Sequence, residues 1–180
     1  MEELIKKAKD GDKEAFTTLM LSLEKELYKI AKARLKNDDD IYDAIQETII
    51  EAFKSIKKLK KIEAFKTWII RILINKTNDT FRRSNKKKEV SFEDINDIEM
   101  GSFYNNENVD ELLDFNFVRK QLKYEDGLII ILYYMEGFSD KEIGKILKLK
   151  ENTVKTKRIR AKQKIKVILD MGEKNNGWTW

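Results

Sequence analysis

The lack of proline is the feature that most restricts the fold of this chain. Its 180 residues include no proline and only seven glycines. Sandwiches and barrels need turn residues about every 8–12 positions, and both glycine and proline supply turns. The composition therefore predicts long helices and an all-α fold.

Two further absences exclude most catalytic chemistry. The chain has no cysteine and no histidine. Without cysteine, disulfides, thiolate metal sites and cysteine nucleophiles are impossible. Without histidine, the commonest general base and the commonest metal ligand are missing. One alternative is a Mg²⁺-dependent enzyme using Asp38, Asp39 and Asp40, but consecutive acids at a helix start do not converge on one point. We expect no enzymatic activity, no metal and no cofactor.

Charge divides the chain into parts. From Glu89 to Val118 there is no lysine or arginine, but there are nine acidic residues. Residues 119–180, in contrast, carry fifteen basic and eight acidic residues. Most of the acidic segment shows no helical period, so it is typical of a linker between two helical domains.

These boundaries predict an N-terminal helical domain at 1–85, a flexible acidic linker at 86–111, a C-terminal helical domain at 112–170 and a tail at 171–180. The alternative is an acidic loop inside one domain. We favour the linker because a structureless loop of this length is uncommon in a compact domain.

The first domain contains three apolar stripes with helical spacing. Asp12 is a candidate N-cap for the first stripe, and the run 37–40 can cap the second. The stripes consist of Phe16, Leu19, Met20, Leu23, Leu27, Ile30 and Ala31, then Ile41, Ala44, Ile45, Thr48, Ala52, Phe53 and Ile56, then Phe65, Trp68, Ile69 and Ile72. We expect all three to face the core.

The second domain is predicted to contain a helix-turn-helix. The apolar run 128–135 fits a buried strand or a buried helix by residue type. The next segment favours a helix, because Ser139 and Glu142 have the spacing of a capping box. A short break at 149–152 then precedes a second helix from about Thr153 to Leu169.

The second helix of this pair carries the strongest functional signal. Between Lys141 and Lys166 there are eleven basic and two acidic residues. A recognition helix places its first side chains on base edges and nearby cations on phosphates. The candidate DNA-binding residues are Asn152, Thr153, Lys155, Thr156, Arg158, Ile159 and Arg160. The alternative is a solvated lysine-rich amphipathic helix, but the capping box and turn favour DNA binding.

Four motifs in this order resemble extracytoplasmic-function (ECF) sigma factors of RNA polymerase. The motifs are Gly11-Asp12-x-x-Ala15-Phe16, Asp43-Ala44-Ile45-Gln46-Glu47-Thr48, Phe65-x-x-Trp68-Ile69-x-x-Ile72 with Asn75 and Arg82-Arg83, and the helix-turn-helix from Leu122 to Ile168. The resemblance covers most of the chain except the linker and the tail. It implies that the second domain recognises the −35 promoter element as duplex DNA.

The resemblance also implies roles for the first domain. Asp43, Gln46 and Glu47 share one helix face and would dock on the clamp helices of core RNA polymerase. The melted strand near the −10 element would be held by Asn75, Asn78, Asp79, Arg82 and Arg83. Trp68 could stack on a base, but its spacing favours the core. The implied partners are core polymerase, promoter DNA and an anti-sigma factor, without a small-molecule substrate.

Two departures from the family pattern matter. The family usually has an apolar residue where Arg158 stands, so the sequence leaves open which of Arg158, Ile159 and Arg160 faces the groove. Trp178 and Trp180 in the tail have no family counterpart and could either dock an inhibitor or fold back.

The expected compartment is the cytoplasm. The N-terminus has no apolar segment typical of a signal peptide, and the longest apolar stretch is far below the roughly 20 residues that span a membrane. The rival DNA-binding function is a stand-alone repressor or activator, which would need a dimer surface and a palindromic site.

Overall fold

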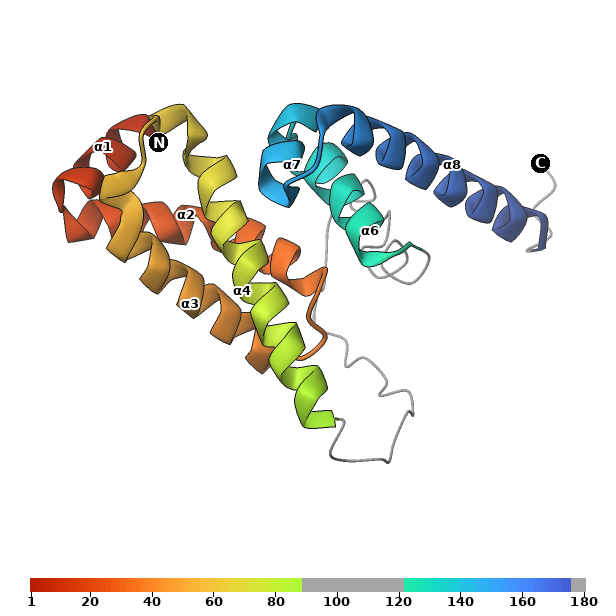
Figure 1. The fold of residues 1–180 in the computed structure, drawn as a ribbon, viewed down its shortest axis with the longest axis horizontal. Coiled ribbons are helices and arrows are strands. Elements are labelled where there is room, and N and C mark those ends of the chain that lie inside the picture. The colour runs from red at the N-terminus through yellow and green to blue at the C-terminus, as the bar shows by residue number, and fades with distance from the viewer. Residues whose placement is uncertain (89–121, 176–180) are drawn as a thin grey trace.

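The protein is helical throughout the described residues, which are 1–88 and 122–175 of this computed structural model (Figure 1). The helices are α1 (Glu2–Asp10), α2 (Lys13–Lys32), α3 (Asp38–Ser55), α4 (Phe65–Lys88), α6 (Tyr124–Ile130), α7 (Asp140–Leu147) and α8 (Glu151–Asn175). This confirms the all-α prediction with two helical domains. Most of the predicted linker, the start of the second domain and both tail tryptophans lie outside the described residues.

Helix caps set the boundaries in the first domain. The side chain of Asp12 accepts a hydrogen bond from the Ala15 N–H at 2.9 Å, and that of Asn37 accepts one from the Asp39 N–H at 3.0 Å. Both predicted caps are therefore confirmed. Helix α1, which the apolar pattern did not predict, ends at Gly11, whose φ of 104° suits glycine and turns the chain into α2.

The predicted stripes of the first domain form its core, with one error. All seven apolar residues of the first stripe are buried. Phe53 was predicted to be buried but is 48% exposed, and its ring centre lies 5.2 Å from that of Phe16 in a T-shaped contact. Ala52 on the same helix and Ile56 directly after it are buried, and Phe53 lies about 100° around the axis from Ala52, so it falls at the margin of the buried face.

The second domain has the predicted helix-turn-helix. The Ser139 Oγ accepts from the Glu142 N–H at 3.3 Å, while the Ser139 N–H donates to Glu142 at 2.9 Å, which confirms the capping box. The run 128–135 forms the end of α6 and a π-helical turn, so the strand alternative is wrong. Helix α8 begins at Glu151, two residues before the predicted start.

Gly144 is required by the turn between α7 and α8. A Cβ atom at this position would lie 2.7 Å from the Leu149 carbonyl oxygen, which is closer than side chains tolerate. Lys148 adopts left-handed backbone angles, with φ 58° and ψ 40°, and ends α7. Together they bring α8 back across α7.

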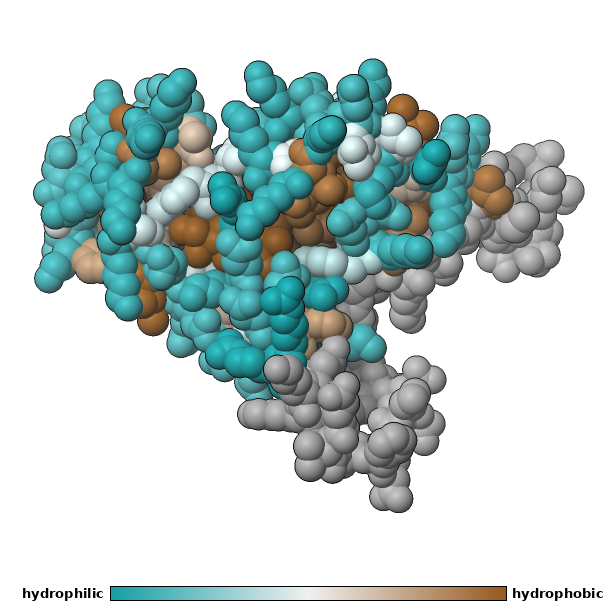
Figure 2. Space-filling model, viewed as in Figure 1, coloured by the Kyte–Doolittle hydropathy of each residue, from teal (hydrophilic) through white to brown (hydrophobic). Residues whose placement is uncertain are grey.

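The two domains contact one another along an apolar seam. Helix α4 packs against α7, and hydrophobic side chains emerge between these two helices in Figure 2. The core of the first domain continues without interruption into residues of the second, which are Leu128, Ile129, Ile131, Leu132, Phe138, Ile143, Ile146 and Val154. Burial of these apolar surfaces holds the domains together.

Arg34 joins the same two domains near the end of α2. Its guanidinium lies 3.7 Å from the ring centre of Phe81 on α4 and 4.1 Å from that of Tyr124 on α6. Its Nε atom is buried without a hydrogen-bond partner in the described parts of the chain. Burial lowers the pKa of Arg34. Burial also strengthens the cation–π attraction between the guanidinium and the two aromatic rings, because this attraction is larger away from water.

Substitution Arg34→Ala is expected to loosen the contact between the domains. Loss of both stacking contacts should lower the free energy of unfolding by about 1–2 kcal/mol. Denaturant titration measures this change, and dyes on one introduced cysteine in each domain report their separation. The control is Arg71→Ala on the exposed surface of α4. Equal stability and equal dye separation in both variants would contradict this role of Arg34.

Candidate nucleic-acid interface

The outer surface of α8 carries most of the predicted recognition residues. We call this surface the α8 face; its members are Asn152, Thr153, Lys155, Thr156, Ile159 and Arg160, and all six are exposed. Val154, Ala161 and Ile165 lie on the opposite side and are buried. The amphipathic pattern thus leaves short polar groups and cations on the solvent side, at the N-terminal end of a long helix.

Arg158 points into the domain instead. Its Nε and Nη2 donate to the two carboxylate oxygens of Asp140, both at 2.8 Å, and the guanidinium stacks 3.8 Å from the ring centre of Tyr133. The side chains of Arg158 and Asp140 are only 13% and 14% exposed. Of the three residues that the sequence could not tell apart, Ile159 and Arg160 are therefore exposed and Arg158 is an internal contact.

The pair also affects ionisation. The hydrogen bonds from Arg158 lower the pKa of Asp140, and those to Asp140 raise the pKa of Arg158. A bidentate contact between a planar guanidinium and a carboxylate fixes both distance and orientation. Because Asp140 is the first residue of α7, this contact sets the rotation of α8 against α7.

Lys157 is held within the domain as well. Its Nζ lies 2.8 Å from Glu125 and 3.2 Å from Asp126, both in the first turn of α6. Lys157 was not among the candidate contacts. The nearby cations Lys155 and Arg160 have no ion pair with a described residue.

The predicted strand-contacting residues form one edge of α4, which we call the α4 edge. It consists of Asn75, Asn78, Asp79, Arg82 and Arg83. All are exposed except Asn78, which is half-buried. Arg82 lies 3.9 Å from Asp79, one turn away. Lys76 lies beside this edge, and the sequence analysis missed it. It stands one helical turn before Asp79 and two turns before Arg83, and this spacing could have identified it.

The predicted docking residues lie on the neighbouring helix. Asp43 and Gln46 are exposed and Glu47 is half-buried on one side of α3. Ile50 and Phe53 extend this side, with exposed fractions of 53% and 48%. We call these five residues the α3 face. The sequence analysis missed Ile50, although helical spacing from Asp43 and Glu47 predicts it on the same side.

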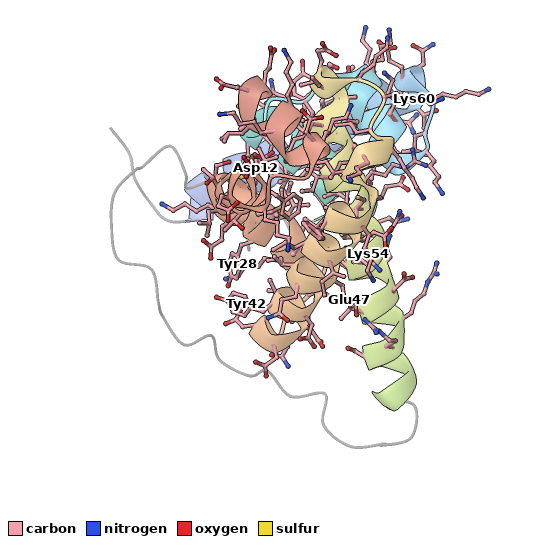
Figure 3. The ribbon with its side chains drawn as sticks, turned by 90° about the vertical axis from the view of Figure 1, so that its left-hand side faces the viewer. Asp12, Tyr28, Tyr42, Glu47, Lys54 and Lys60 are labelled. Carbon is pink, nitrogen blue, oxygen red and sulfur yellow. The ribbon has the colours of Figure 1, made fainter. Side chains whose placement is uncertain are left out.

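Glu47 joins the α3 face to the α4 edge. Its carboxylate accepts a hydrogen bond from Arg83 at 2.9 Å and lies 3.7 Å from the Nζ of Lys76. The hydrogen bond from Arg83 lowers the pKa of Glu47. In Figure 3, Glu47 lies on the α4 side of α3, whereas Tyr42 lies on the other side. The two predicted surfaces are therefore adjacent.

The acidic run at the start of α3 is used within the fold. Asp38 accepts a hydrogen bond from the Tyr28 hydroxyl and Asp40 accepts one from the Ser84 hydroxyl, both at 3.0 Å. Within 1–88 and 122–175, no cluster of three acidic side chains could surround a metal ion. The same residues include no helix long and apolar enough to cross a membrane.

Two sequence families match the two domains. The family described as Sigma-70 region 2 matches residues 19–87, and the family described as Sigma-70, region 4 matches residues 120–165. The first match covers the second and third motifs of the sequence analysis, and the second match covers most of the helix-turn-helix; the motif at 11–16 lies outside both.

Curated relatives match nearly the whole chain. RNA polymerase sigma factor SigV of Bacillus subtilis is 30% identical over 165 residues, which cover 91% of this chain and 96% of the relative. The ECF RNA polymerase sigma-E factor of Haemophilus influenzae is 25% identical over 173 residues, covering 90% and 91%.

Solved structures show the same fold. CnrH in complex with the cytosolic domain of CnrY superposes with a TM-score of 0.69 at 22% identity, covering 94% of this chain and 97% of CnrH. The sigma factor RpoE in complex with the anti-sigma factor NepR from Bartonella quintana gives a TM-score of 0.67 at 22% identity, covering 86% and 96%.

Arg158→Ala should lower the stability of the protein, whereas Arg160→Ala should leave it nearly unchanged. Removing Arg158 leaves Asp140 without its partner in a mostly buried position, so we expect the free energy of unfolding to fall by about 2–3 kcal/mol. Arg160 is exposed, and its removal should change stability by less than about 0.5 kcal/mol. Denaturant titration of both variants checks this, and similar values for the two would refute the internal role of Arg158.

The contribution of the Arg158–Asp140 pair should depend on pH. The pKa of Asp140 in the folded protein is below its ordinary value of 3.8. The stabilisation is therefore fully present above pH 3.8 and is lost as the pH falls through the folded-state pKa. The stability difference between the wild type and Arg158→Ala should shrink over this range. Asp140→Asn serves as the control background, because the effect of Arg158→Ala in that background should not follow this titration.

Proposed function

Because this chain belongs to the ECF family of RNA polymerase sigma factors, we propose that its three surfaces divide the work of promoter recognition. The chain is an alternative sigma factor that directs promoter-specific transcription initiation. In this proposal the α8 face binds the −35 element, the α4 edge holds the melted strand near the −10 element, and the α3 face docks on core polymerase.

The α8 face has the side chains that a duplex requires. Asn152, Thr153 and Thr156 are short polar groups at the start of the helix, where a recognition helix meets base edges. Ile159 offers an apolar contact for a thymine methyl group. Lys155 and Arg160 flank them as cations for phosphates. The exposure of this polar face, with Arg158 turned inward, is the observation that carries the proposal.

The α4 edge suits a single strand. Arg82 and Arg83 supply positive charge along a backbone, and Asn75 and Asn78 have amides that can donate to or accept from an exposed base edge. Trp68 packs partly buried against the core, which supports its structural assignment. Asp79 pairs with Arg82 and orients it.

The α3 face combines carboxylates with apolar side chains. Asp43 and Glu47 would meet cations on polymerase, which steers association and sets orientation. Ile50 and Phe53 supply apolar area that a partner can bury, and apolar anchors of this kind provide most of the affinity at interfaces. A helix face with carboxylates toward one end and apolar side chains toward the other fits a basic helical partner.

Further properties follow from this function. The protein works with polymerase in the cytoplasm, has no catalytic activity of its own, and uses no cofactor or small-molecule substrate. An anti-sigma factor is a second protein partner. The structural similarity to a sigma factor solved with the anti-sigma factor NepR supports this partner.

Reconstituted transcription tests the whole proposal. Purified protein and core polymerase are incubated with genomic DNA fragments, and the start sites are mapped. We expect starts that depend on the protein and share two sequence elements upstream. Failure to bind core polymerase, together with dimeric binding to palindromic DNA, would instead support a stand-alone repressor.

Lys155→Ala and Arg160→Ala should weaken binding of promoter duplex. If the lost contact is to a phosphate, all sequences should weaken alike and the slope of log K against log salt should fall by about 0.9. If it is to a base, discrimination at one position should relax by about 1–3 kcal/mol. Lys6→Ala, on the exposed surface of α1, removes the same charge far from α8 and serves as the control. Affinities like that of the control would remove both residues from the interface.

A further inference from the structure

The boundary between the α3 face and the α4 edge contains one shared carboxylate. Glu47 belongs to the α3 face, yet its ion-pair partners Lys76 and Arg83 lie on α4. Asp43, one turn earlier on the same face, forms no ion pair with a described residue and acts on Arg83 only at longer range. Glu47 is therefore the member of the α3 face that directly neutralises cations beside the strand.

These contacts are positioned for exchange with a partner. The side chains of Glu47 and Arg83 are 36% and 58% exposed, so both can be reached from solvent. The Arg83 guanidinium also donates to the Thr80 hydroxyl at 3.1 Å, and this contact within α4 can hold the side chain in place when Glu47 leaves. Lys76 is 28% exposed and remains at the same edge.

A carboxylate that binds a cationic partner surface no longer neutralises the cations beside it. If Glu47 turns to a basic helix of polymerase, Lys76 and Arg83 lose their counter-charge and become free to bind phosphates. Binding of polymerase to Glu47 would thus raise the affinity of Lys76 and Arg83 for DNA. Such coupling between two ligands is reciprocal. Docking and strand binding would then strengthen each other.

We propose that Glu47 is a positioning residue that couples polymerase docking to binding of the melted strand. In the free protein it holds Lys76 and Arg83 against α3, and in the docked protein it releases them to the DNA backbone. The inference rests on the proposed function, because it takes the α3 face as the polymerase contact and the α4 edge as the strand contact.

The coupling is small for each contact, since exposed ion pairs contribute little in water. A pair of this exposure corresponds to a change in affinity of about two- to fivefold. Each additional phosphate contact on a single strand should also steepen the dependence of log K on log salt by about 0.7. The slope is informative because a purely structural role for Glu47 would not increase it.

The test uses the full-length wild type, Glu47→Gln and Asp43→Asn. A fluorescent single-stranded oligonucleotide is titrated with each free protein over a series of salt concentrations. Glu47→Gln should bind about two- to fivefold more tightly than the wild type, with a steeper salt slope. Asp43→Asn removes the same charge from the same helix face without breaking an ion pair, so it should change neither quantity comparably.

The second arm repeats the titration with each protein saturated by core polymerase. The advantage of Glu47→Gln should disappear, because docking has already drawn Glu47 away in the wild type. Equal gains for Glu47→Gln and Asp43→Asn would overturn the inference, since they would reflect total charge alone. No gain for Glu47→Gln, or a gain that persists on polymerase, would also overturn it.

Failure of the proposed function would look different. In that case the wild type itself would not bind core polymerase, or would support no protein-dependent transcription start. If the wild type binds polymerase and starts transcription while Glu47→Gln shows no gain on the free oligonucleotide, the proposed function stands and only the coupling is refuted.

Discussion

The contact between Arg158 and Asp140 determines what the second domain can present to DNA. It joins the middle of α8 to the first residue of α7 through two parallel hydrogen bonds. A helix rotated by one residue would turn about 100° and place a different set of side chains outward. With Arg158 fixed inside, Thr156, Ile159 and Arg160 lie on the outside.

The first domain uses the same chemistry for a different purpose. Glu47 and Arg83 also form a carboxylate–guanidinium pair, but their side chains are far more exposed than those of Arg158 and Asp140. Burial makes the second-domain pair a fixed element of the fold, because breaking it leaves an unpaired charge out of water. Exposure makes the first-domain pair exchangeable, because water and a partner can replace either side.

The sequence predicted what depends on neighbouring positions and missed what depends on distant ones. The caps at Asp12 and Ser139 and the first apolar stripe, on α2, follow from spacings of three and four residues, and all were confirmed. The partner of Arg158 lies 18 residues away and that of Arg83 lies 36 away, so neither pair can be derived from helical periodicity. The pattern likewise shows which face of a helix is apolar but not which helix covers it. For this reason it predicted two domains and not their shared core.

That shared core constrains how the protein can engage a promoter. Both surfaces proposed to bind DNA are exposed while the domains touch, so neither surface needs the domains to separate before it can bind. Separating them, however, would expose apolar residues such as Ile129 and Leu132 and would unstack Arg34 from Phe81 and Tyr124. Exposing apolar surface to water is unfavourable in proportion to its area. Any promoter geometry that differs from the spacing of the joined domains must therefore draw the free energy of separation from binding to polymerase.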